Sequence, residues 1–445
     1  MRHAIIVDLG FGDAGKGSVV DWLASPAASA VAGLARPPVA VVRFNGGAQA
    51  GHNVVTPDGR HHCFAQFGSA TLHGVPTVLS RHMLVEPLAV AAEARALAAL
   101  GVPDPLGLLR VDVDALLTTP YHAAVNQARE TARGAAAHGS CGMGIGETVA
   151  YDLAHPEDAP RVRDIMHRSR LRRLLQRMRD RTVDTINQVR PTRDPAELPS
   201  VDTLLDVYRQ FARVARLVDA GYLRRVARAG RLVFEGAQGV LLDETNGFHP
   251  HTTWSRTTFE NASELLTVAG VDVHDRDQVL RVGVTRTYAT RHGSGPLVSE
   301  DASLLPLLPE PHNTTGRWQG AFRVGHLDLV ALRYAVDVCA GIDALAVTHL
   351  DTAANADRRA PGALQVAAAW YLPSLPGPLL RRLHLPTDGP STQLTGLAFH
   401  AQPVLRSPPT GWAALLHDEL ATPVLVQSWG PTWTHKLPNP VAVAA

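Results

Sequence analysis

Lysine is almost absent from this chain of 445 residues, although lysine and arginine together number 42. The lysines are Lys16 and Lys436, so nearly all of the positive charge lies on arginine. Lys16 stands in a glycine-rich stretch near the N-terminus. The broad planar fork of arginine cannot replace a compact ammonium group inside a small anion-binding loop. A lysine kept at this point indicates that the loop needs the ammonium group itself.

Cysteine, net charge and long apolar runs are also scarce. Cys63, Cys141 and Cys339 are far apart and form no C-x-x-C pair, which argues against a disulfide framework and a structural zinc site. A formal charge of +1 gives no overall field that attracts nucleic acid or an anionic membrane. No apolar run approaches membrane-spanning length, and the N-terminus lacks a signal-peptide layout. We expect a cytoplasmic protein with no nucleic-acid or membrane partner.

The opening stretch, residues 4–23, has the pattern of a buried strand, a glycine-rich loop and a helix. Glycines let backbone N–H groups curl round an anion, and the helix adds the positive end of its dipole. The spacing Gly10-x-x-x-x-Gly15-Lys16 is close to the Walker pattern, but Gly17 stands where a serine or threonine would bind magnesium. Asp13, inside the loop, is therefore the better candidate for a magnesium ligand.

A second glycine-rich turn, residues 45–51, follows a stretch at 38–44 that reads as a buried strand. Ligands in open α/β sheets gather where strand ends meet loops, so we expect both glycine-rich loops on one side of the sheet. His52 follows the second turn directly. A histidine presented beside a phosphate-binding loop is a candidate general acid.

These two loops resemble the opening motifs of adenylosuccinate synthetases. Residues 12–17 read G-D-A-G-K-G where the family has G-D-E-G-K-G, and residues 46–52 read G-G-A-Q-A-G-H where it has G-G-x-N-A-G-H. Further motifs follow in the family's order: G-S-C-G-M-G-I-G at 139–146 for G-T-T-G-R-G-I-G, an unchanged F-E-G-A-Q-G at 234–239, H-T-T-W-S at 251–255 for Y-V-T-S-S, H-L-D at 349–351 for K-L-D, and S-W-G-P at 428–431 for S-T-G-P. An ordered set of glycine motifs is specific.

The resemblance runs in patches from residue 4 to about residue 436, without a clear domain break. It implies an α/β fold, with a single large domain (1–445) around a mainly parallel β-sheet and a P-loop-like phosphate-binding loop. Residues 352–420 diverge most, and 439–445 have the composition of a loose tail. The family is usually a homodimer, so we expect one here.

The resemblance also implies a chemistry, the GTP-dependent joining of L-aspartate to the 6-oxo carbon of a purine nucleotide, IMP. Asp13 would remove the N1 proton so that the 6-oxygen attacks the γ-phosphate of GTP. His52 would donate to the charge that develops on the leaving side, and Lys16 would neutralise phosphate oxygens. Mg²⁺ would be bound by Asp13 and the Gly51 carbonyl. Aspartate would then displace the 6-phosphoryl group.

Binding residues follow from the same motifs. Asp351 can accept from both N1–H and the exocyclic amine of guanine, which favours GTP over ATP. GTP would contact Gly12, Gly15, Lys16, Gly17, Gly51, His52, Asn53, His349, Asp351, Ser428, Gly430 and Pro431. The acceptor nucleotide would contact Gln49, Cys141, Gln238 and Thr253, and aspartate would contact Thr314, Thr315, Arg317 and Arg323.

Several departures from the family pattern cluster on the acceptor side. Gln49 replaces an asparagine, Cys141 a threonine and Met143 an arginine, while Ala14 replaces the glutamate of the first loop. Three hypotheses therefore stay open: a ligase acting on IMP, the same chemistry on another purine-like nucleotide such as GMP, dGMP or a nucleoside-antibiotic precursor, and a GTP-binding regulatory protein without catalysis. Retention of both Asp13 and His52 makes the last the weakest of the three, and Asp13 also counts against the phage-type reaction on dGMP, because the phage enzymes typically lack the catalytic aspartate.

Overall fold

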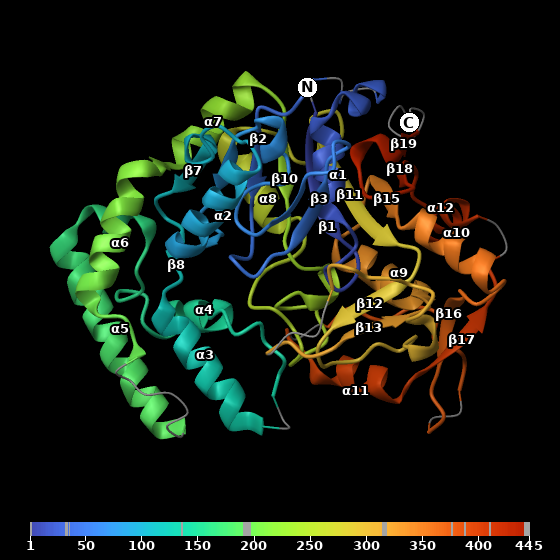
Figure 1. Ribbon diagram of the computed structural model, residues 1–445. Coiled ribbons are helices and arrows are strands. Elements are labelled where there is room, and N and C mark those ends of the chain that lie inside the picture. Colours follow the sequence, from blue (N-terminus) through green and yellow to red (C-terminus); the bar gives the residue numbers. More distant parts are fainter. Residues whose placement is uncertain are drawn as a thin grey trace.

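The computed structural model describes residues 2–31, 34, 36–134, 137–189, 197–313, 318–374, 377–386, 389–408 and 411–439. The described residues contain a ten-stranded β-sheet (Figure 1). Its strands, from one edge to the other, are β19 (Lys436–Pro438), β18 (Val424–Ser428), β15 (Ala344–Thr348), β11 (Val279–Arg286), β1 (His3–Asp8), β10 (Leu232–Glu235), β2 (Ala40–Arg43), β5 (Thr77–Leu79), β7 (Leu109–Asp112) and β9 (Arg216–Val218).

Neighbouring strands of this sheet run parallel, except for the antiparallel pair β18 and β19 at one edge. The central strand β1 is buried along its whole length. A strand that is covered on both faces needs an unbroken apolar run, as residues 4–7 provide. The prediction of a mainly parallel α/β sheet is confirmed.

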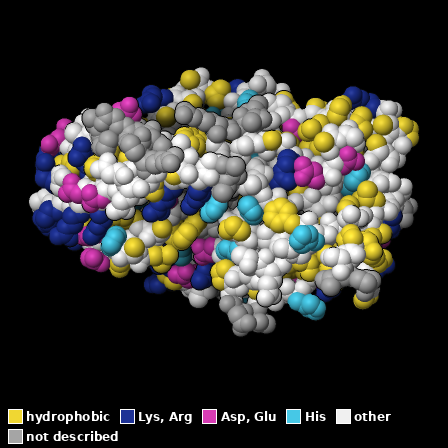
Figure 2. All heavy atoms as spheres, turned by 90° about the horizontal axis from the view of Figure 1, so that it is seen from below, with side chains coloured by type: hydrophobic (Ala, Val, Ile, Leu, Met, Phe, Trp, Pro, Cys, Tyr) yellow, Lys and Arg dark blue, Asp and Glu magenta, His cyan; other side chains and the backbone are white. Residues whose placement is uncertain are grey.

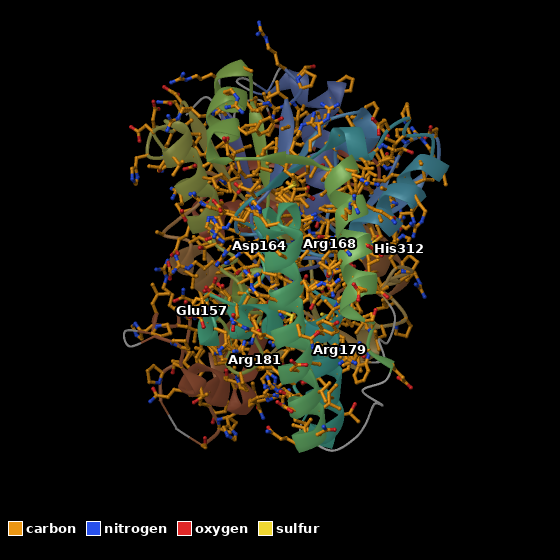
Figure 3. The ribbon with its side chains drawn as sticks, turned by 90° about the vertical axis from the view of Figure 1, so that its left-hand side faces the viewer. Glu157, Asp164, Arg168, Arg179, Arg181 and His312 are labelled. Carbon is orange, nitrogen blue, oxygen red and sulfur yellow. The ribbon has the colours of Figure 1, made fainter. Side chains whose placement is uncertain are left out.

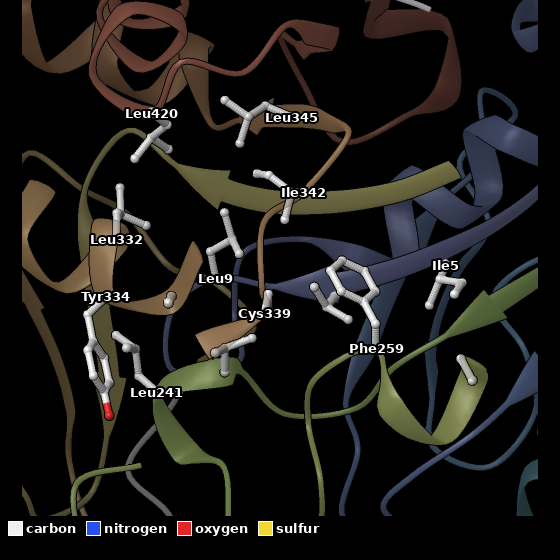
Figure 4. Close-up of a cluster of buried hydrophobic side chains, with 14 of the residues drawn as sticks. Ile5, Leu9, Leu241, Phe259, Leu332, Tyr334, Cys339, Ile342, Leu345 and Leu420 are labelled. Carbon is white, nitrogen blue, oxygen red and sulfur yellow. The ribbon is translucent and has the colours of Figure 1, made fainter. Parts of the chain in front are cut away.

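The two faces of β1 contribute to different cores, because successive side chains of a strand point to opposite faces. Ala4 and Ile6 pack with α1 (Lys16–Ala24) on one face. Ile5 and Val7 lie in the core of the other face, part of which is shown in Figure 4. The α-helices that contribute to that second core are α7 (Ala220–Ala229), α8 (Glu260–Ala269), α9 (Leu329–Val338), α10 (Leu350–Arg359), α11 (Thr392–His400) and α12 (Trp412–Leu420).

A helical side with its own core flanks the β7 and β9 edge of the sheet (Figure 1). It consists of α2 (Pro87–Ala99), α3 (Pro120–Arg133), α4 (Ile145–Ala154), α5 (Arg168–Val189) and α6 (Val201–Val214). Helix α5 buries leucines such as Leu171 and Leu175 and directs its arginines outward, among them Arg168 and Arg179 (Figure 3). Basic side chains accordingly gather over this side of the molecule (Figure 2).

Short secondary elements complete the described chain. β3 (His52–Val55) and β4 (His61–Phe64) form a hairpin, β6 (Leu84–Val85) pairs with β8 (Leu116–Leu117), and β12 (Ala289–His292) pairs with β13 (Phe322–Gly325). A small sheet contains β14 (Leu327–Asp328), β16 (Val366–Tyr371) and β17 (Gln402–Arg406), and α10 (Leu350–Arg359) follows β15. Among the described residues, no helix has the length and apolar character needed to cross a membrane.

The parallel strands place several loops at one edge of the sheet. The segments after β1, β10 and β2 are neighbours because these strands are adjacent. The segments after β11, β15 and β18 follow on the other side of β1. Ligands of open α/β sheets bind at such a carboxyl edge.

Candidate active site

The first glycine-rich loop is organised by the carboxylate of Asp8, the last residue of β1. Its Oδ1 accepts hydrogen bonds from the backbone N–H groups of Gly10 at 2.8 Å and Gly12 at 3.3 Å, and its Oδ2 accepts from Ala14 at 2.7 Å. Gly12 and Gly15 adopt positive φ angles of 115° and 89°, which explains the need for glycine. The loop is therefore tied to the end of the central strand.

Lys16 is buried at the first position of α1, with 2% of its surface exposed. Its ammonium group lies 3.1 Å from Oδ2 of Asp8 and donates to the carbonyl oxygens of Gly12 at 2.8 Å and Gln238 at 2.7 Å. Lys16 thus links the first loop to the loop after β10. In this structure its three donors are all engaged within the protein.

His52 faces Glu235, the last residue of β10. Nδ1 of His52 lies 2.6 Å from Oε1 of Glu235, which also accepts from the Ser69 hydroxyl at 2.5 Å, and Oε2 of Glu235 accepts from the Ser69 backbone N–H at 2.9 Å. Burial, reinforced by Arg43, lowers the pKa of His52 to about 4. Burial alone would raise the pKa of Glu235, but Arg43, His52 and Ser69 outweigh it and lower this pKa to about 2. The pair is a neutral imidazole that donates to a carboxylate.

The residues predicted to bind GTP line one cleft of about 1160 Å³. It brings together segments from four parts of the chain: Gly12, Gly15, Lys16, Gly17, Gly51, His52, Asn53, His349, Asp351, Ser428, Gly430 and Pro431. Asp13 and Gly51 line it as well, so the oxygens expected to bind Mg²⁺ share one space. Both glycine-rich loops therefore lie on the same side of the sheet.

The end of this cleft that would receive the base is formed by α10 and the turn after β18. Asp351 lies in the first turn of α10. His349 precedes the helix with a positive φ of 59°, and its Nδ1 lies 2.9 Å from the hydroxyl of Thr348. Its ring meets the edge of Tyr288 at a centroid distance of 5.8 Å. His349 thus lies between Tyr288 and the first loop.

The four residues predicted to contact the acceptor nucleotide line a second cleft, of about 1240 Å³. They are Gln49, Cys141, Gln238 and Thr253. Both polar atoms of the Gln49 side-chain amide are buried without a hydrogen-bond partner, which is costly unless a ligand satisfies them. Gln49 therefore fits a ligand-contacting role, whereas Cys141 packs beside the apolar cluster around Ile145.

Asp13 and His292 lie where the two clefts approach each other. Asp13 lines the first cleft and His292 lines the second, and Nε2 of His292 lies 3.4 Å from Oδ2 of Asp13. Burial raises the pKa of Asp13, although His292, Arg286 and Lys16 oppose the rise. The nearest cation-forming side chain to this carboxylate is thus His292, while Lys16 faces Asp8.

The residues expected to bind aspartate are only partly described. Thr314, Thr315 and Arg317 lie outside the described residues. Arg323, in β13, donates to the carbonyls of Gly293 at 3.0 Å and Gly295 at 2.8 Å, and to Glu300 at 2.6 Å. It therefore holds the 293–295 turn beside the acceptor cleft.

The oxygen atoms of Asp13 and Gly51 are suitable ligands for Mg²⁺. Asp13 offers a carboxylate and Gly51 a carbonyl oxygen in the same cleft, and oxygen is the ligand that Mg²⁺ prefers. Within the described ranges, no group of three or more His, Cys, Asp or Glu side chains could hold a metal ion. A site with few protein ligands is the kind in which Mg²⁺ keeps water and binds phosphate oxygens of the substrate.

Three residues of the site were not predicted from the sequence. Asp8 could have been predicted, because an acidic residue ends a buried strand directly before a glycine-rich loop. Glu235 stood inside the F-E-G-A-Q-G motif, but its partner is 183 residues away. His292 stood in a stretch, residues 288–296, that also resembles the family, but the resemblance gave it no role among the 21 histidines.

Comparisons with known proteins identify the family of this chain. The family model described as adenylosuccinate synthetase matches residues 5–371. The adenylosuccinate synthetase of Thioalkalivibrio sulfidiphilus is 36% identical over 360 residues, covering 79% of this chain and 77% of that protein. The enzyme of Neisseria gonorrhoeae is 32% identical over 360 residues, with the same coverage.

Two solved structures share the fold. Fully ligated adenylosuccinate synthetase from Plasmodium falciparum has a TM-score of 0.80 and 20% identity, covering 99% of this chain and 100% of the other. The succinoaminodeoxyadenylate synthetase of cyanophage S-2L, bound to dGMP and dATP, has a TM-score of 0.60 and 16% identity, covering 100% of this chain and 97% of the other. Fold, motif order and sequence identity agree, and the chain belongs to the adenylosuccinate synthetase family of GTP-dependent ligases.

Proposed function

We propose that the protein joins L-aspartate to the 6-oxo carbon of IMP at the expense of GTP, through a 6-phosphoryl intermediate. The observation that carries this proposal is the meeting of two clefts at Asp13 and His292. One cleft collects the residues matched to GTP and the other those matched to the acceptor. A transfer of the γ-phosphoryl group from one nucleotide to the other requires such a junction.

In the first step, the carboxylate of Asp13 takes the N1 proton of IMP. The 6-oxygen then attacks the γ-phosphorus of GTP, and GDP leaves. The raised pKa of Asp13 supports this role, because a carboxylate that is less stable when charged is a stronger base. Asp13 remains partly exposed, with a quarter of its side-chain surface open, so the acceptor can reach it.

His52 stabilises the phosphate charge as GDP leaves. Its Nδ1 faces Glu235, so Nε2 is the nitrogen left for a phosphate oxygen. To donate from both nitrogens the ring must take up a proton, which an adjacent triphosphate favours and Glu235 supports. The ionised Glu235 is held ready for that charge by Arg43 and Ser69.

Magnesium, held by Asp13 and the Gly51 carbonyl, would supply charge compensation for the donor phosphates. The carboxylate of Asp8 and the glycines of the first loop fix the backbone of that loop beside the GTP cleft. The residues of the loop itself therefore need little rearrangement.

In the second step, the α-amine of aspartate attacks C6, the phosphate leaves, and a proton leaves the amine. Arg317, which lies outside the described residues, is the side chain that the family resemblance assigns to the aspartate carboxylate, since a guanidinium group can bind a carboxylate through two hydrogen bonds. Arg323 supports this region through the 293–295 turn. Exclusion of water by the surrounding loops protects the phosphorylated intermediate.

The residues that differ from the family motifs suggest a second candidate acceptor. Gln49 and Cys141 both line the acceptor cleft, and they differ from the family motifs. The phage enzyme that shares the fold was solved with dGMP. The same chemistry on GMP, dGMP or a related 6-oxopurine nucleotide is therefore the alternative that the experiment must include.

The assembly and location that accompany this function are a homodimer in the cytoplasm. Both are expectations carried by family membership. Light scattering of the purified protein tests the dimer, and fractionation of the producing cells tests the location.

The test of function is phosphate release from GTP that depends on aspartate and on one acceptor. IMP, GMP, dGMP and inosine are each supplied with GTP, Mg²⁺ and L-aspartate. We expect release with IMP and formation of the succinyl adduct by mass spectrometry. No release with any acceptor would contradict the proposal, and release with GMP or dGMP alone would select the alternative.

A further inference from the structure

Both lysines of this chain are buried and donate to backbone carbonyls of loops that line the two clefts. Lys16 is 2% exposed and Lys436 is 3% exposed. The ammonium group of Lys436 donates to the carbonyl oxygens of Gly430 at 2.9 Å and Thr432 at 3.3 Å. Lys436 has no part in the family motifs described above, yet its contacts parallel those of Lys16.

The turn held by Lys436 closes one end of the GTP cleft. It begins at Ser428, which pairs with Lys436 across β18 and β19, and it includes the cleft residues Gly430 and Pro431. The Gly430 carbonyl accepts a second hydrogen bond from the Ser428 hydroxyl at 3.1 Å. A side chain at Gly430 would approach the His435 ring to 2.5 Å, so the turn has little room to move.

Lys436 also interacts electrostatically with two carboxylates from different helices. Asp21 belongs to α1, and Asp351 belongs to α10 and lines the same cleft. Asp21 has a further partner in His73, at 2.8 Å, and His435 lies in the short helical segment Trp433–His435 that precedes Lys436. Burial lowers the pKa of Lys436 to about 8, and the two carboxylates limit the fall.

We propose that Lys436 is a positioning residue for base recognition, which fixes the Ser428–Pro431 turn and the charge beside Asp351 and so sets the preference for guanine. This proposal rests on GTP binding by the cleft. The ammonium group holds the turn through two carbonyl oxygens and places a positive charge near Asp351, the carboxylate expected to read the edge of guanine. The enzyme therefore recognises guanine through Asp351 in a geometry that Lys436 maintains.

A lysine is needed at position 436 because the side chain is buried and has two carbonyl acceptors close to each other. The acceptors are the carbonyl oxygens of Gly430 and Thr432, and the tetrahedrally arranged N–H donors of one ammonium group can serve both within a small space. A planar guanidinium directs its donors in one plane and occupies more space.

The first measurement is nucleotide binding without turnover, using a fluorescent GTP analogue and the rise in melting temperature caused by GTP and by ITP. The variants are Lys436→Met, Lys436→Arg and, as a control on the same strand, Leu437→Gln, whose side chain is exposed. Loss of a charged hydrogen-bond donor predicts weaker GTP binding by about tenfold to a hundredfold in Lys436→Met. Lys436→Arg should resemble Lys436→Met, and Leu437→Gln should resemble the unchanged protein.

The preference for GTP over ITP distinguishes a positioning role of Lys436 from a general contribution to the stability of the fold. ITP lacks the exocyclic amine that Asp351 can read, so the unchanged protein should prefer GTP, and Lys436→Met should lose most of that preference. In turnover assays the KM for GTP should rise while kcat and the KM for IMP stay within about twofold. In the unchanged protein, the KM for GTP should also rise above about pH 8, as Lys436 loses its proton.

Two results would overturn the proposal. One is unchanged GTP binding and GTP-over-ITP preference in Lys436→Met. The other is an equal loss of affinity for GTP, ITP and IMP together with a lower melting temperature, which is the mark of a purely structural role. Because binding is measured directly, a protein that binds GTP but ligates no acceptor refutes the proposed ligation and leaves the role of Lys436 testable.

Discussion

Nδ1 of His52 lies 2.6 Å from Oε1 of Glu235, and both side chains are buried. The two residues come from β3 and β10, which belong to different sheets. With the pKa of His52 near 4 and that of Glu235 near 2, the unliganded pair is a neutral ring and an ionised carboxylate at neutral pH. The carboxylate fixes the tautomer, and it stabilises the imidazolium that phosphate binding creates.

Replacing Glu235 by glutamine should lower turnover about a hundredfold or more while leaving GTP affinity less affected. The amide keeps the shape of the carboxylate but cannot stabilise a charged ring, and it can orient the ring in the wrong tautomer. The measurement is kcat beside the Kd for GTP. His52→Ala should cost a similar amount, and the double variant should cost little more than either. Additive losses would show that the residues act separately.

Replacing Asp13 by asparagine should abolish most turnover, by roughly the hundredfold to ten-thousandfold of a lost general base. GTP should still bind through the loop amides, because Asp8 and Lys16 organise the loop without Asp13. The base must be ionised, and burial raises its pKa, so activity of the unchanged protein should fall as the pH drops through that raised value. Unchanged turnover in Asp13→Asn would reject the catalytic role.

Replacing Asp351 by asparagine should shift the nucleotide preference from GTP toward XTP. A carboxylate only accepts hydrogen bonds, as guanine requires, whereas an amide can also donate to the 2-oxo group of xanthine. The ratio of kcat/KM for GTP to that for XTP is the quantity to measure. Thr352→Ala, at the next position in the same cleft, is the matched control and should keep the preference for GTP. Equal use of GTP and ATP by the unchanged protein would count against the guanine assignment.

The stability of the protein should depend on pH through Asp328, the residue that caps the N-terminus of α9. This carboxylate accepts from the backbone N–H groups of Val330 and Ala331 and from the Trp370 indole at 2.9 Å. Burial outweighs these contacts and raises its pKa from 3.8 to about 6. The folded protein therefore binds a proton more tightly than the unfolded chain, so this group contributes stability at low pH that is lost as the pH rises through about 6.

The contribution of Asp328 to the free energy of unfolding should be larger at pH 5 than at pH 7 by about 1 kcal/mol. Denaturant unfolding of the unchanged protein and of Asp328→Asn at both pH values isolates this difference. Asp337→Asn, on the same helix but a third exposed, is the control and should show no such change. A difference of the opposite sign would contradict the assignment.

Sequence alone determined the features that depend on local pattern. The Gly10 to Lys16 spacing placed a phosphate loop after the first strand, and the structure has strand, loop and helix there. The order of short motifs identified the family and named a set of residues that the structure places around one cleft. These predictions succeed because a turn with positive φ angles, or a strand buried on both faces, restricts which residues can occupy it.

Only the tertiary structure decided which side chains meet across the sheet. The sequence assigned Lys16 to phosphate oxygens, but the order of β1, β10 and β2 brings its ammonium group to Asp8 and to the Gln238 carbonyl, 222 residues away. The same strand order sets Glu235 against His52, and the pairing of β12 with β13 presents His292 to Asp13. Strand order is a property of the whole chain, because it depends on which surfaces bury most apolar area together. For this reason no local motif encodes these contacts.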